Sequence, residues 1–260
     1  MSKDKVHINN FLGCYKSEEF IKLIIAWAGD LRGKRMLKTD LREEAYGEDE
    51  ILFSLSNNDF LSYGVDKNIE TVKAATAIMK KRNLEKNIYM TADIREIPFK
   101  DKVFDLIVSS STLDHFREEK DFTKSLVELK RVLKNDGIMI ITINNQCNLI
   151  FYFFAKLEQL FGLVDYPIKF YTLKRIRRLL DKIGLVIYSD DRIVSIINPL
   201  NSVLILMRRL KVADSLINVF AKGIVKLAKL LDKQRGIKIF TSWFIAIKCI
   251  KKTNEITFCS

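Results

Sequence analysis

The chain has 260 residues, of which 48% are hydrophobic, so it can bury a sizeable core in one large domain or two small ones. Its formal net charge of +12 favours anionic partners such as nucleic acid, acidic lipid headgroups or a phosphorylated substrate, with a basic solvated surface as the alternative. No run approaches the ~20 apolar residues of a membrane span, and four cysteines without a CxxC pair, with only two histidines, argue against a metal site.

The chain begins with a segment that lacks the apolar core of a signal peptide, so we expect a cytoplasmic protein with reduced thiols. Residues 16–29 predict an amphipathic helix with Ser17 as N-cap and Gly29 as its stop, which would cover one edge or the mouth of a sheet. The first strand is expected at Arg35–Thr39, followed by a helix at Glu48–Leu55.

Three further short strands are predicted to end in polar residues. Phe60–Val65 and Val103–Val108 are apolar runs rich in β-branched or aromatic residues, and Asn87–Thr91 is a shorter strand between them. Because ligands bind at the carboxyl ends of the strands in an open parallel sheet, the residues after these strands would share one crevice. They are Asp66 with Lys67, Asp93 with Ile94, and Ser109 with Ser110. Asp66 is placed to accept hydrogen bonds from a ribose diol, and Asp93 could meet an adenine edge.

The region after the fourth strand contains the richest polar cluster, residues 109–116. His115 could act as a general base because imidazole titrates near working pH, and Asp114 is a second, weaker candidate. A histidine here could equally position a loop or pack against the next helix. Between and after these strands, helices are expected at Asn68–Lys81, where the apolar stripe would be core, and at Asp121–Lys134, before a strand at Ile138–Ile143.

The last hundred residues change in composition. Leu149–Val164 is dense in aromatic residues and is interpreted first as core and second as an apolar acceptor site. Tyr171–Leu185 predicts a helix capped by Thr172 that leads into a strand, and Ser242–Ile250 predicts the last strand. The insertion Asn198–Gly236 mixes apolar with basic residues, so it could lie at an anionic membrane surface or simply cap the sheet.

Four motifs, in order, resemble those of class I S-adenosylmethionine-dependent methyltransferases of the type 11 kind. They are Gly64-Val65-Asp66, Ala92-Asp93-Ile94, Phe104–Val108 followed by Leu113–Phe116, and the helix Leu126–Leu133 with the turn and strand that follow it. The resemblance implies a Rossmann-like, doubly wound, mostly parallel seven-stranded sheet with helices on both faces. It also implies S-adenosylmethionine as cofactor, and a division into a helical cap, residues 1–33, and a methyltransferase domain, residues 34–260.

The first motif of that family is a Gly-rich turn beside the methionine part of the cofactor, and here it reads Lys-Thr-Asp-Leu-x-Glu-Glu-Ala. Glycines serve there because a Cβ would block close approach or forbid positive φ. Two interpretations stay open. In a variant site, oxygen atoms replace the glycines as contacts to the amino group and sulfonium, from Thr39, Asp40, Glu43 and Glu44. In an eroded site, cofactor binding is lost.

The leading hypothesis is therefore methyl transfer to an unidentified small-molecule or lipid-linked acceptor, apolar or glycolipid-like, by a cytoplasmic protein that could be peripheral at the membrane. The alternative is a catalytically inactive binding or scaffold protein of the same fold. A nicotinamide-dependent oxidoreductase is disfavoured because the sequence lacks Gly-x-Gly-x-x-Gly. Nucleic acid is disfavoured as a partner because no aromatic platforms lie between the basic residues.

Overall fold

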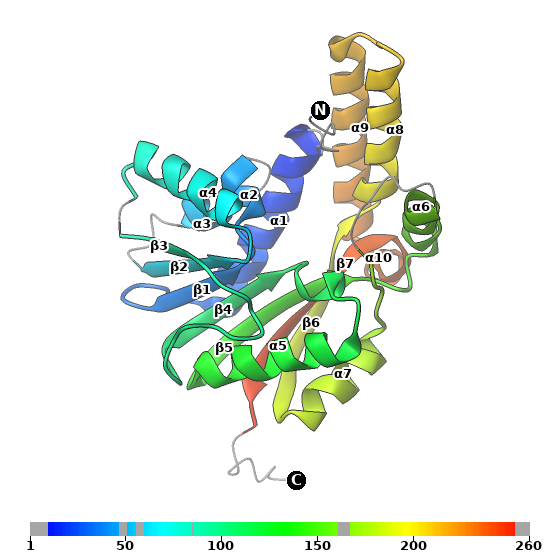
Figure 1. Ribbon diagram of the computed structural model, residues 1–260. Helices are drawn as coiled ribbons and strands as arrows, with labels where there is room; N and C mark the ends of the chain where they lie inside the picture. Colours follow the sequence, from blue (N-terminus) through cyan, green and yellow to red (C-terminus); the bar gives the residue numbers. More distant parts are fainter. Residues whose placement is uncertain (1–9, 47–50, 56–59, 85, 161–166, 253–260) are drawn as a thin grey trace.

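The protein folds around one seven-stranded sheet with helices on both faces (Figure 1). This computed structural model describes residues 10–46, 51–55, 60–84, 86–160 and 167–252. The strand order is β3-β2-β1-β4-β5-β7-β6. The strands are β1 (Arg35–Thr39), β2 (Leu61–Asp66), β3 (Ile88–Thr91), β4 (Phe104–Ser110), β5 (Leu133–Asn144), β6 (Leu185–Ser195) and β7 (Ser242–Lys251).

Six strands run in the same direction, and β7 runs antiparallel between β5 and β6. The prediction of a doubly wound, mostly parallel seven-stranded sheet is confirmed. The chain runs outward from β1 to β2 and β3 on one side and then returns to β4 on the other. The two windings therefore meet between β1 and β4, which is where an open α/β sheet leaves a crevice at its carboxyl edge.

One face of the sheet is covered by α5 (Glu119–Val132) and α7 (Leu173–Lys182). Both helices bury an apolar stripe, including Leu126 and Leu129 from α5 and Leu180 from α7. Thr172 caps α7 as predicted, since its side chain accepts a hydrogen bond from the Arg175 amide. The strand after α5 was predicted to begin at Ile138, but β5 begins at Leu133, directly after the helix.

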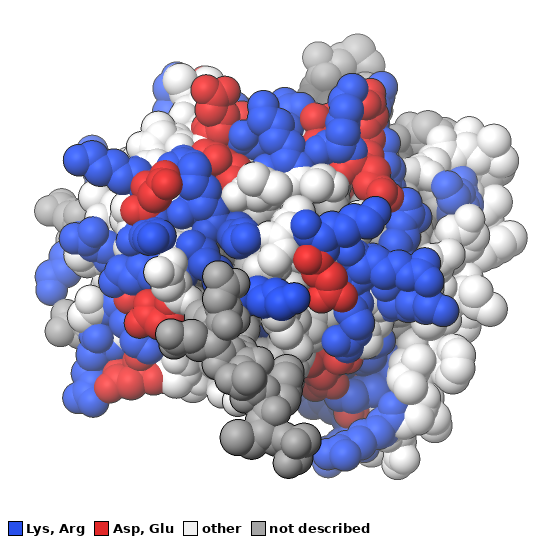
Figure 2. All heavy atoms as spheres, turned by 90° about the horizontal axis from the view of Figure 1, so that it is seen from below, with Lys and Arg blue, Asp and Glu red and all other residues white. Residues whose placement is uncertain are grey.

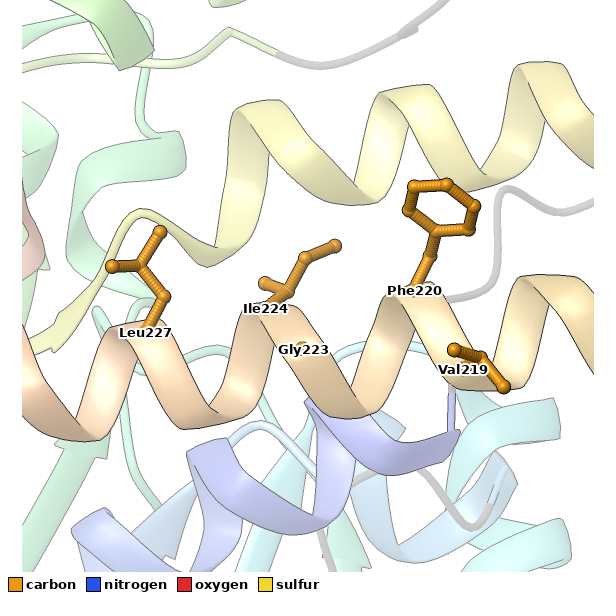
Figure 3. A pocket seen from close by; sticks show the side chains of 5 residues that line it. All are labelled: Val219, Phe220, Gly223, Ile224 and Leu227. Atoms are coloured by element: carbon orange, nitrogen blue, oxygen red, sulfur yellow. The ribbon is translucent and has the colours of Figure 1, made fainter.

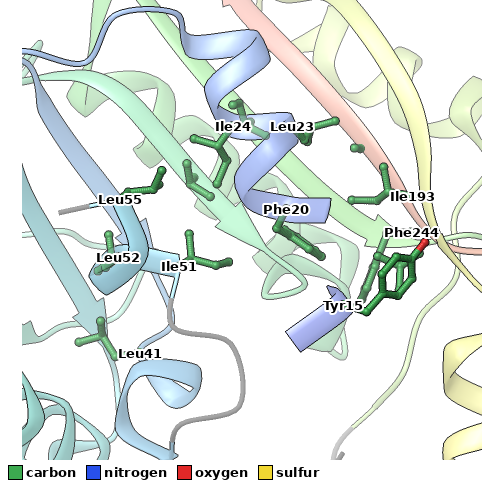
Figure 4. Packing of buried hydrophobic residues seen from close by; sticks show 14 of the residues in the cluster. Tyr15, Phe20, Leu23, Ile24, Leu41, Ile51, Leu52, Leu55, Ile193 and Phe244 are labelled. Atoms are coloured by element: carbon green, nitrogen blue, oxygen red, sulfur yellow. The ribbon is translucent and has the colours of Figure 1, made fainter. Parts of the chain in front are cut away.

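The opposite face is covered by α1 (Asn10–Ala28), α2 (Arg42–Tyr46), α3 (Ile51–Leu55), α4 (Ile69–Lys81) and α9 (Asp214–Asp232). Figure 4 shows side chains of α1 and α3 packed on this face of the sheet. The helix predicted at residues 16–29 begins earlier than expected, and it ends as predicted before Gly29, which has φ +67°. The expected helix at residues 48–55 is shorter, and residues 48–50 lie outside the described part of the chain.

The apolar stripe of α4 was expected to be core, but its first member, Ile69, is 53% exposed. Ile69 is the first residue of the helix, directly after the N-cap Asn68, and the buried positions begin with Thr71 and Val72. The aromatic segment after β5 forms α6 (Leu149–Leu160), in which Phe151 and Ala155 are buried while most of its other apolar side chains are exposed. The interpretation of this segment as ordinary core is therefore wrong for most of the helix.

The insertion before β7 is helical, as predicted, and forms α8 (Ile197–Arg209), α9 and α10 (Arg235–Thr241). Helices α8 and α9 form a hairpin that rises beyond the sheet, with α6 beside it (Figure 1). No helix among the described residues is both long enough and apolar enough to cross a bilayer. Figure 2 shows that Lys and Arg side chains spread over the face seen from below, with Asp and Glu between them.

Candidate functional site

The candidate site lies at the carboxyl edge of the sheet, where the loop after β1 meets the ends of β2 and β4. This loop packs tightly against β2, because a Cβ on Gly64 would lie 2.4 Å from Cδ2 of the buried Leu41. Gly64 therefore provides the space for a loop that itself contains no glycine between Lys38 and Tyr46.

A buried lysine organises the loop. Lys38 lies at the end of β1 and is completely buried. Its Nζ donates hydrogen bonds to the backbone oxygen of Asp40 at 2.7 Å, to Oε2 of Glu43 at 2.7 Å and to Oε2 of Glu44 at 2.8 Å. An ammonium group has three donors, so Lys38 is fully satisfied. The loop is thus held from beneath by an ion cluster.

The pKa values in this cluster follow from burial and from the opposing charges. Burial alone would lower the pKa of Lys38, but the carboxylates of Glu43 and Glu44 raise it instead. Burial opposes the ionisation of Glu43, yet Lys38 and Lys16 bring its pKa down to about 2. For Glu44, burial and the neighbouring charge of Glu43 prevail over Lys38 and raise its pKa to about 7. Lys38 and Glu43 thus stay ionised, while Glu44 titrates near neutral pH.

The turn after β1 contains a residue with left-handed backbone conformation that is not glycine. Asp40 has φ +69°, a region that aspartate tolerates better than most residues. Its amide donates to the Val65 oxygen at 2.8 Å, and its Oδ1 accepts from the Arg42 amide at 2.8 Å. Burial, followed by the charge of Glu43, raises the pKa of Asp40. Asp40 therefore takes the backbone role expected of a glycine at this turn.

Asp66 lies next to this turn. Its Oδ2 accepts the Leu41 amide at 3.0 Å, and its Oδ1 accepts the Asn68 amide at 2.8 Å. A carboxylate has about four lone-pair sites, so Asp66 can accept further hydrogen bonds. The structure thus brings two predicted site residues together, since Asp40 follows β1 and Asp66 ends the neighbouring strand β2.

Other predicted residues are arranged differently. Thr39 and Ser109 are completely buried and share a hydrogen bond of 2.9 Å, so they join the ends of β1 and β4. The hydroxyl of Ser110, on the opposite face of β4, is buried and has no hydrogen-bond partner among the described residues. Glu44 is completely buried with Lys38, and its Oε1 accepts the Leu52 amide at 3.2 Å.

The loop after β3 holds Asp93 in an ion pair. Arg95 donates from Nη2 to Oδ2 of Asp93 at 2.6 Å and also contacts Asp121 at 3.1 Å. The hydrogen bonds from Arg95 lower the pKa of Asp93. Ile94 is buried in the core beside it, whereas Lys67, after Asp66, is exposed. Asp93 is thus a carboxylate held in a fixed orientation just after β3, the edge strand of the sheet.

The two candidates for general acid-base catalysis have structural partners. Asp114 is completely buried, its Oδ2 accepts the amide of Asn144 at 3.0 Å, and burial raises its pKa. Nδ1 of His115 lies 3.2 Å from the carbonyl oxygen of Pro167, a contact that requires the proton on Nδ1. Asp114 therefore anchors the end of β5, and His115 joins two loops.

The N-terminal helix closes over this site. Nζ of Lys16 in α1 lies 3.2 Å from Oε1 of Glu43 and 5.6 Å from the ring centroid of Trp243. The indole of Trp243 in turn donates to Oδ1 of Asn144 at 3.1 Å. Sequence reasoning predicted a covering helix but missed Lys16, Lys38 and Trp243. For Lys38 a signal was present, because a lysine inside an apolar strand needs nearby acids, and two follow five and six residues later.

Among the described residues, no group of three His, Cys, Asp or Glu side chains is placed to hold a metal ion. The site thus consists of an acidic loop held by a buried lysine, a carboxylate at the end of β2, a helical cover, and a buried hydroxyl at the end of β4 that has no partner among the described residues.

Residues 45–141 match the family model described as a methyltransferase domain. An uncharacterised protein of Methanocaldococcus jannaschii is 26% identical over 147 residues, which are 55% of this chain and 63% of that protein, so the match spans less than two thirds of its length.

Two solved structures show the same fold. One, provisionally named a sarcosine dimethylglycine methyltransferase from Galdieria sulphuraria, has a TM-score of 0.61 and 16% identity, covering 91% of this chain and 85% of that one. The other is geranyl diphosphate C-methyltransferase from Streptomyces coelicolor, with a TM-score of 0.58 and 10% identity, covering 89% and 78%. At these identities the likeness is one of fold.

Proposed function

We propose that this chain, of which residues 45–141 match a methyltransferase domain, transfers a methyl group from S-adenosylmethionine to a small-molecule or lipid-linked acceptor. The observation that carries the proposal is the meeting of two carboxylates at the carboxyl edge of the sheet, where Asp40 follows β1 and Asp66 ends β2 and accepts the amide of Leu41. An anionic rim of this kind suits a ligand with a cationic end and a diol.

The residues present fit such a ligand. Asp66 would hold the ribose hydroxyls, Asp40 the ammonium of the methionine end, and Asp93 with Ile94 the adenine. The buried and unpartnered hydroxyl of Ser110 supports a ligand in the crevice, because such a group is costly unless something binds it. Glu43 and Glu44 would act indirectly, since Lys38 already occupies them. S-adenosylmethionine, when bound, supplies a methyl group that its sulfonium activates toward a nucleophile.

The chain's own contribution to the reaction would be alignment and exclusion of water. Positioning two reactants can supply much of a rate enhancement, so a strong general base is not required. Asp114 is committed to the Asn144 amide, which makes it a positioning residue. The contact between Nδ1 of His115 and the Pro167 oxygen would fix the orientation of the imidazole ring. Helix α1 would cover the crevice through the contact between Lys16 and Glu43.

We propose an apolar acceptor. The support is α6, which follows β5 on the same edge of the sheet and exposes several apolar side chains, among them Leu149, Ile150 and Phe153. The fold relative from Streptomyces coelicolor is named for geranyl diphosphate, which is apolar along its chain. Within this proposal, residues 1–33 are a helical cap on a catalytic domain at 34–260, and the protein works in the cytoplasm or at its membrane surface.

Cofactor binding tests the proposal. We expect calorimetric titration to detect S-adenosylmethionine and S-adenosylhomocysteine. Asp66→Ala should weaken binding by roughly 1.5–3 kcal/mol, the scale of hydrogen bonds that involve a charged group. Asp40→Asn should weaken it about tenfold while keeping the turn, because asparagine also tolerates positive φ.

The matched control is Asp136→Asn, an exposed aspartate at the other end of β5. Its cofactor affinity should equal that of the wild type. If the wild-type protein binds neither ligand, the inactive scaffold is the correct alternative. If it binds both and Asp66→Ala changes nothing, the assignment of the ribose to Asp66 is wrong.

A further inference from the structure

The α8–α9 hairpin carries an exposed apolar stripe. Along α9 the stripe recurs every three or four residues, so its members lie on one side of the helix. They are Leu216, Val219, Phe220, Gly223, Leu227 and Leu230. Val219 is 66% and Phe220 57% exposed, and together with Gly223, Ile224 and Leu227 they line a shallow groove. Figure 3 shows Phe220, Ile224 and Leu227 rising from α9 on the side of α8. We call this stripe the outer face of α9.

A second stripe, of lysines, runs beside the first. Lys222, Lys226, Lys229 and Lys233 also recur at intervals of three and four residues, and all are exposed. At 100° per residue they lie roughly a quarter turn or more from the centre of the outer face, on the side away from α8. The buried residues Ile217, Ala221 and Ala228 occupy the remaining side, against the body of the protein. Helix α9 thus has three sides: one buried against the protein, one apolar and exposed, and one basic and exposed.

Two of these lysines have partners in α1. Lys229 lies 3.5 Å from Glu18, and Lys222 lies over the ring of Phe11 at 5.1 Å. Within the described residues, no ion pair involves Lys226 or Lys233. Residues 197–241 as a whole contain nine Lys and Arg but only two Asp, so the hairpin and α10 are strongly basic.

From these observations we infer that the outer face of α9 docks on an anionic lipid bilayer. An apolar stripe flanked by lysines lets the apolar side chains enter the boundary of the acyl chains while the ammonium groups reach the headgroups. Each basic residue near an anionic surface contributes on the order of 1 kcal/mol. This inference concerns a partner surface and does not depend on the cofactor or on the reaction proposed above.

Charge argues against a second copy of the chain as the occupant. In a two-fold symmetric dimer the same patch faces itself, so the lysine row of one copy would approach the lysine row of the other. Like charges brought together at an interface are unfavourable. An anionic bilayer complements the apolar and the basic stripe together, whereas self-association would satisfy only the apolar one.

Vesicle co-sedimentation tests this inference. We expect the full chain to bind vesicles of phosphatidylserine and phosphatidylcholine at low salt, to bind far less at high salt, and to bind pure phosphatidylcholine weakly. Lys226→Glu with Lys233→Glu should lower binding to the anionic vesicles at least about tenfold. Phe220→Ser should also lower it, through the loss of apolar burial.

Matched controls come from α4, on the far side of the molecule (Figure 1). Lys80→Glu with Lys81→Glu removes as many exposed lysines, and Ile69→Ser removes an apolar side chain of similar exposure. These variants should bind as the wild type does. All variants should keep the wild-type circular dichroism and cofactor affinity, which separates this test from that of the proposed function.

Three outcomes would overturn the inference. The first is that the wild type does not bind anionic vesicles at low salt. The second is that the α4 lysine variant loses binding as strongly as the α9 variant, in which case the net charge of the whole protein is responsible. The third is a dimer in sedimentation equilibrium that Phe220→Ser dissociates, without vesicle binding, which would assign the outer face of α9 to a second copy.

Discussion

Lys38 is the residue on which the loop after β1 depends. Burying an ammonium is costly unless charge and hydrogen bonds compensate it, and here three acceptors do so within 2.8 Å. The same contacts hold Glu43 and Glu44 beneath the loop, which leaves Asp40 and Asp66 as the carboxylates beside the crevice.

We predict that Lys38→Met destabilises the protein by about 3–5 kcal/mol, because it leaves buried carboxylates without their counter-charge. Urea unfolding measures this. Adding Glu43→Gln should recover part of the loss, since the carboxyl group that is ionised in the wild type is then replaced by a neutral one. If Lys38→Met lowered the free energy of unfolding by less than about 1 kcal/mol, water or a rearranged side chain would be replacing the amine. The loop after β1 would then not depend on Lys38.

The raised pKa of Glu44 predicts a pH dependence. A carboxyl group whose pKa rises to about 7 on folding binds its proton more tightly in the folded state than in the unfolded state. The free energy of unfolding therefore falls as the pH increases from 4.5, the ordinary pKa of glutamate, toward 7. Relative to Glu44→Gln, the wild type should therefore lose up to about 3 kcal/mol of unfolding free energy between pH 4.5 and pH 7. Denaturant titrations of both proteins at a series of pH values would measure the difference. Parallel curves would show that Glu44 does not titrate there.

At the scale of elements, Asp232 joins three parts of the fold. It accepts hydrogen bonds from the Tyr15 hydroxyl of α1 and, at 2.6 Å, from the Ser195 hydroxyl of β6, while it belongs to α9 itself. Burial raises its pKa, and the two hydroxyl donors oppose that rise. The helical cover and the hairpin are thus fixed to the sheet through one carboxylate.

We predict that Asp232→Ala destabilises the packing of α1 and α9. The substitution leaves the partly buried hydroxyl groups of Tyr15 and Ser195 without this acceptor, at a cost of about 1–3 kcal/mol. Hydrogen exchange should speed up in α1 and in α9, with little change in α5 on the opposite face. Asp214→Ala, at the exposed start of α9, is the control and should affect only the first turn of that helix. Equal exchange in Asp232→Ala and the wild type would show that apolar packing alone holds α1 and α9.

At the scale of the whole molecule, the doubly wound, mostly parallel sheet was implied by the resemblance to class I methyltransferases, and the structure confirms it. Periodicity and strand-end residues predicted individual strands, and Arg35–Thr39 has the predicted bounds. These features are local, because a buried strand needs a short apolar run and a capped helix needs a polar residue at its start. The amphipathic character of the insertion was visible for the same reason.

What the sequence could not determine is where a side chain finds its partner. Thr39, Asp40, Glu43 and Glu44 look alike as oxygen acceptors along the chain, yet Lys38 takes both glutamates, Ser109 takes Thr39, and Asp40 keeps its place at the turn. Lys16 and Trp243 reach the site from opposite ends of the sequence. The sequence by itself determined the positions of strands and helices and of the polar residues that follow the strands, since local pattern encodes them. Only the tertiary structure decided which of those groups remain beside the crevice, because hydrogen bonds and ion pairs depend on distances that chain order does not contain.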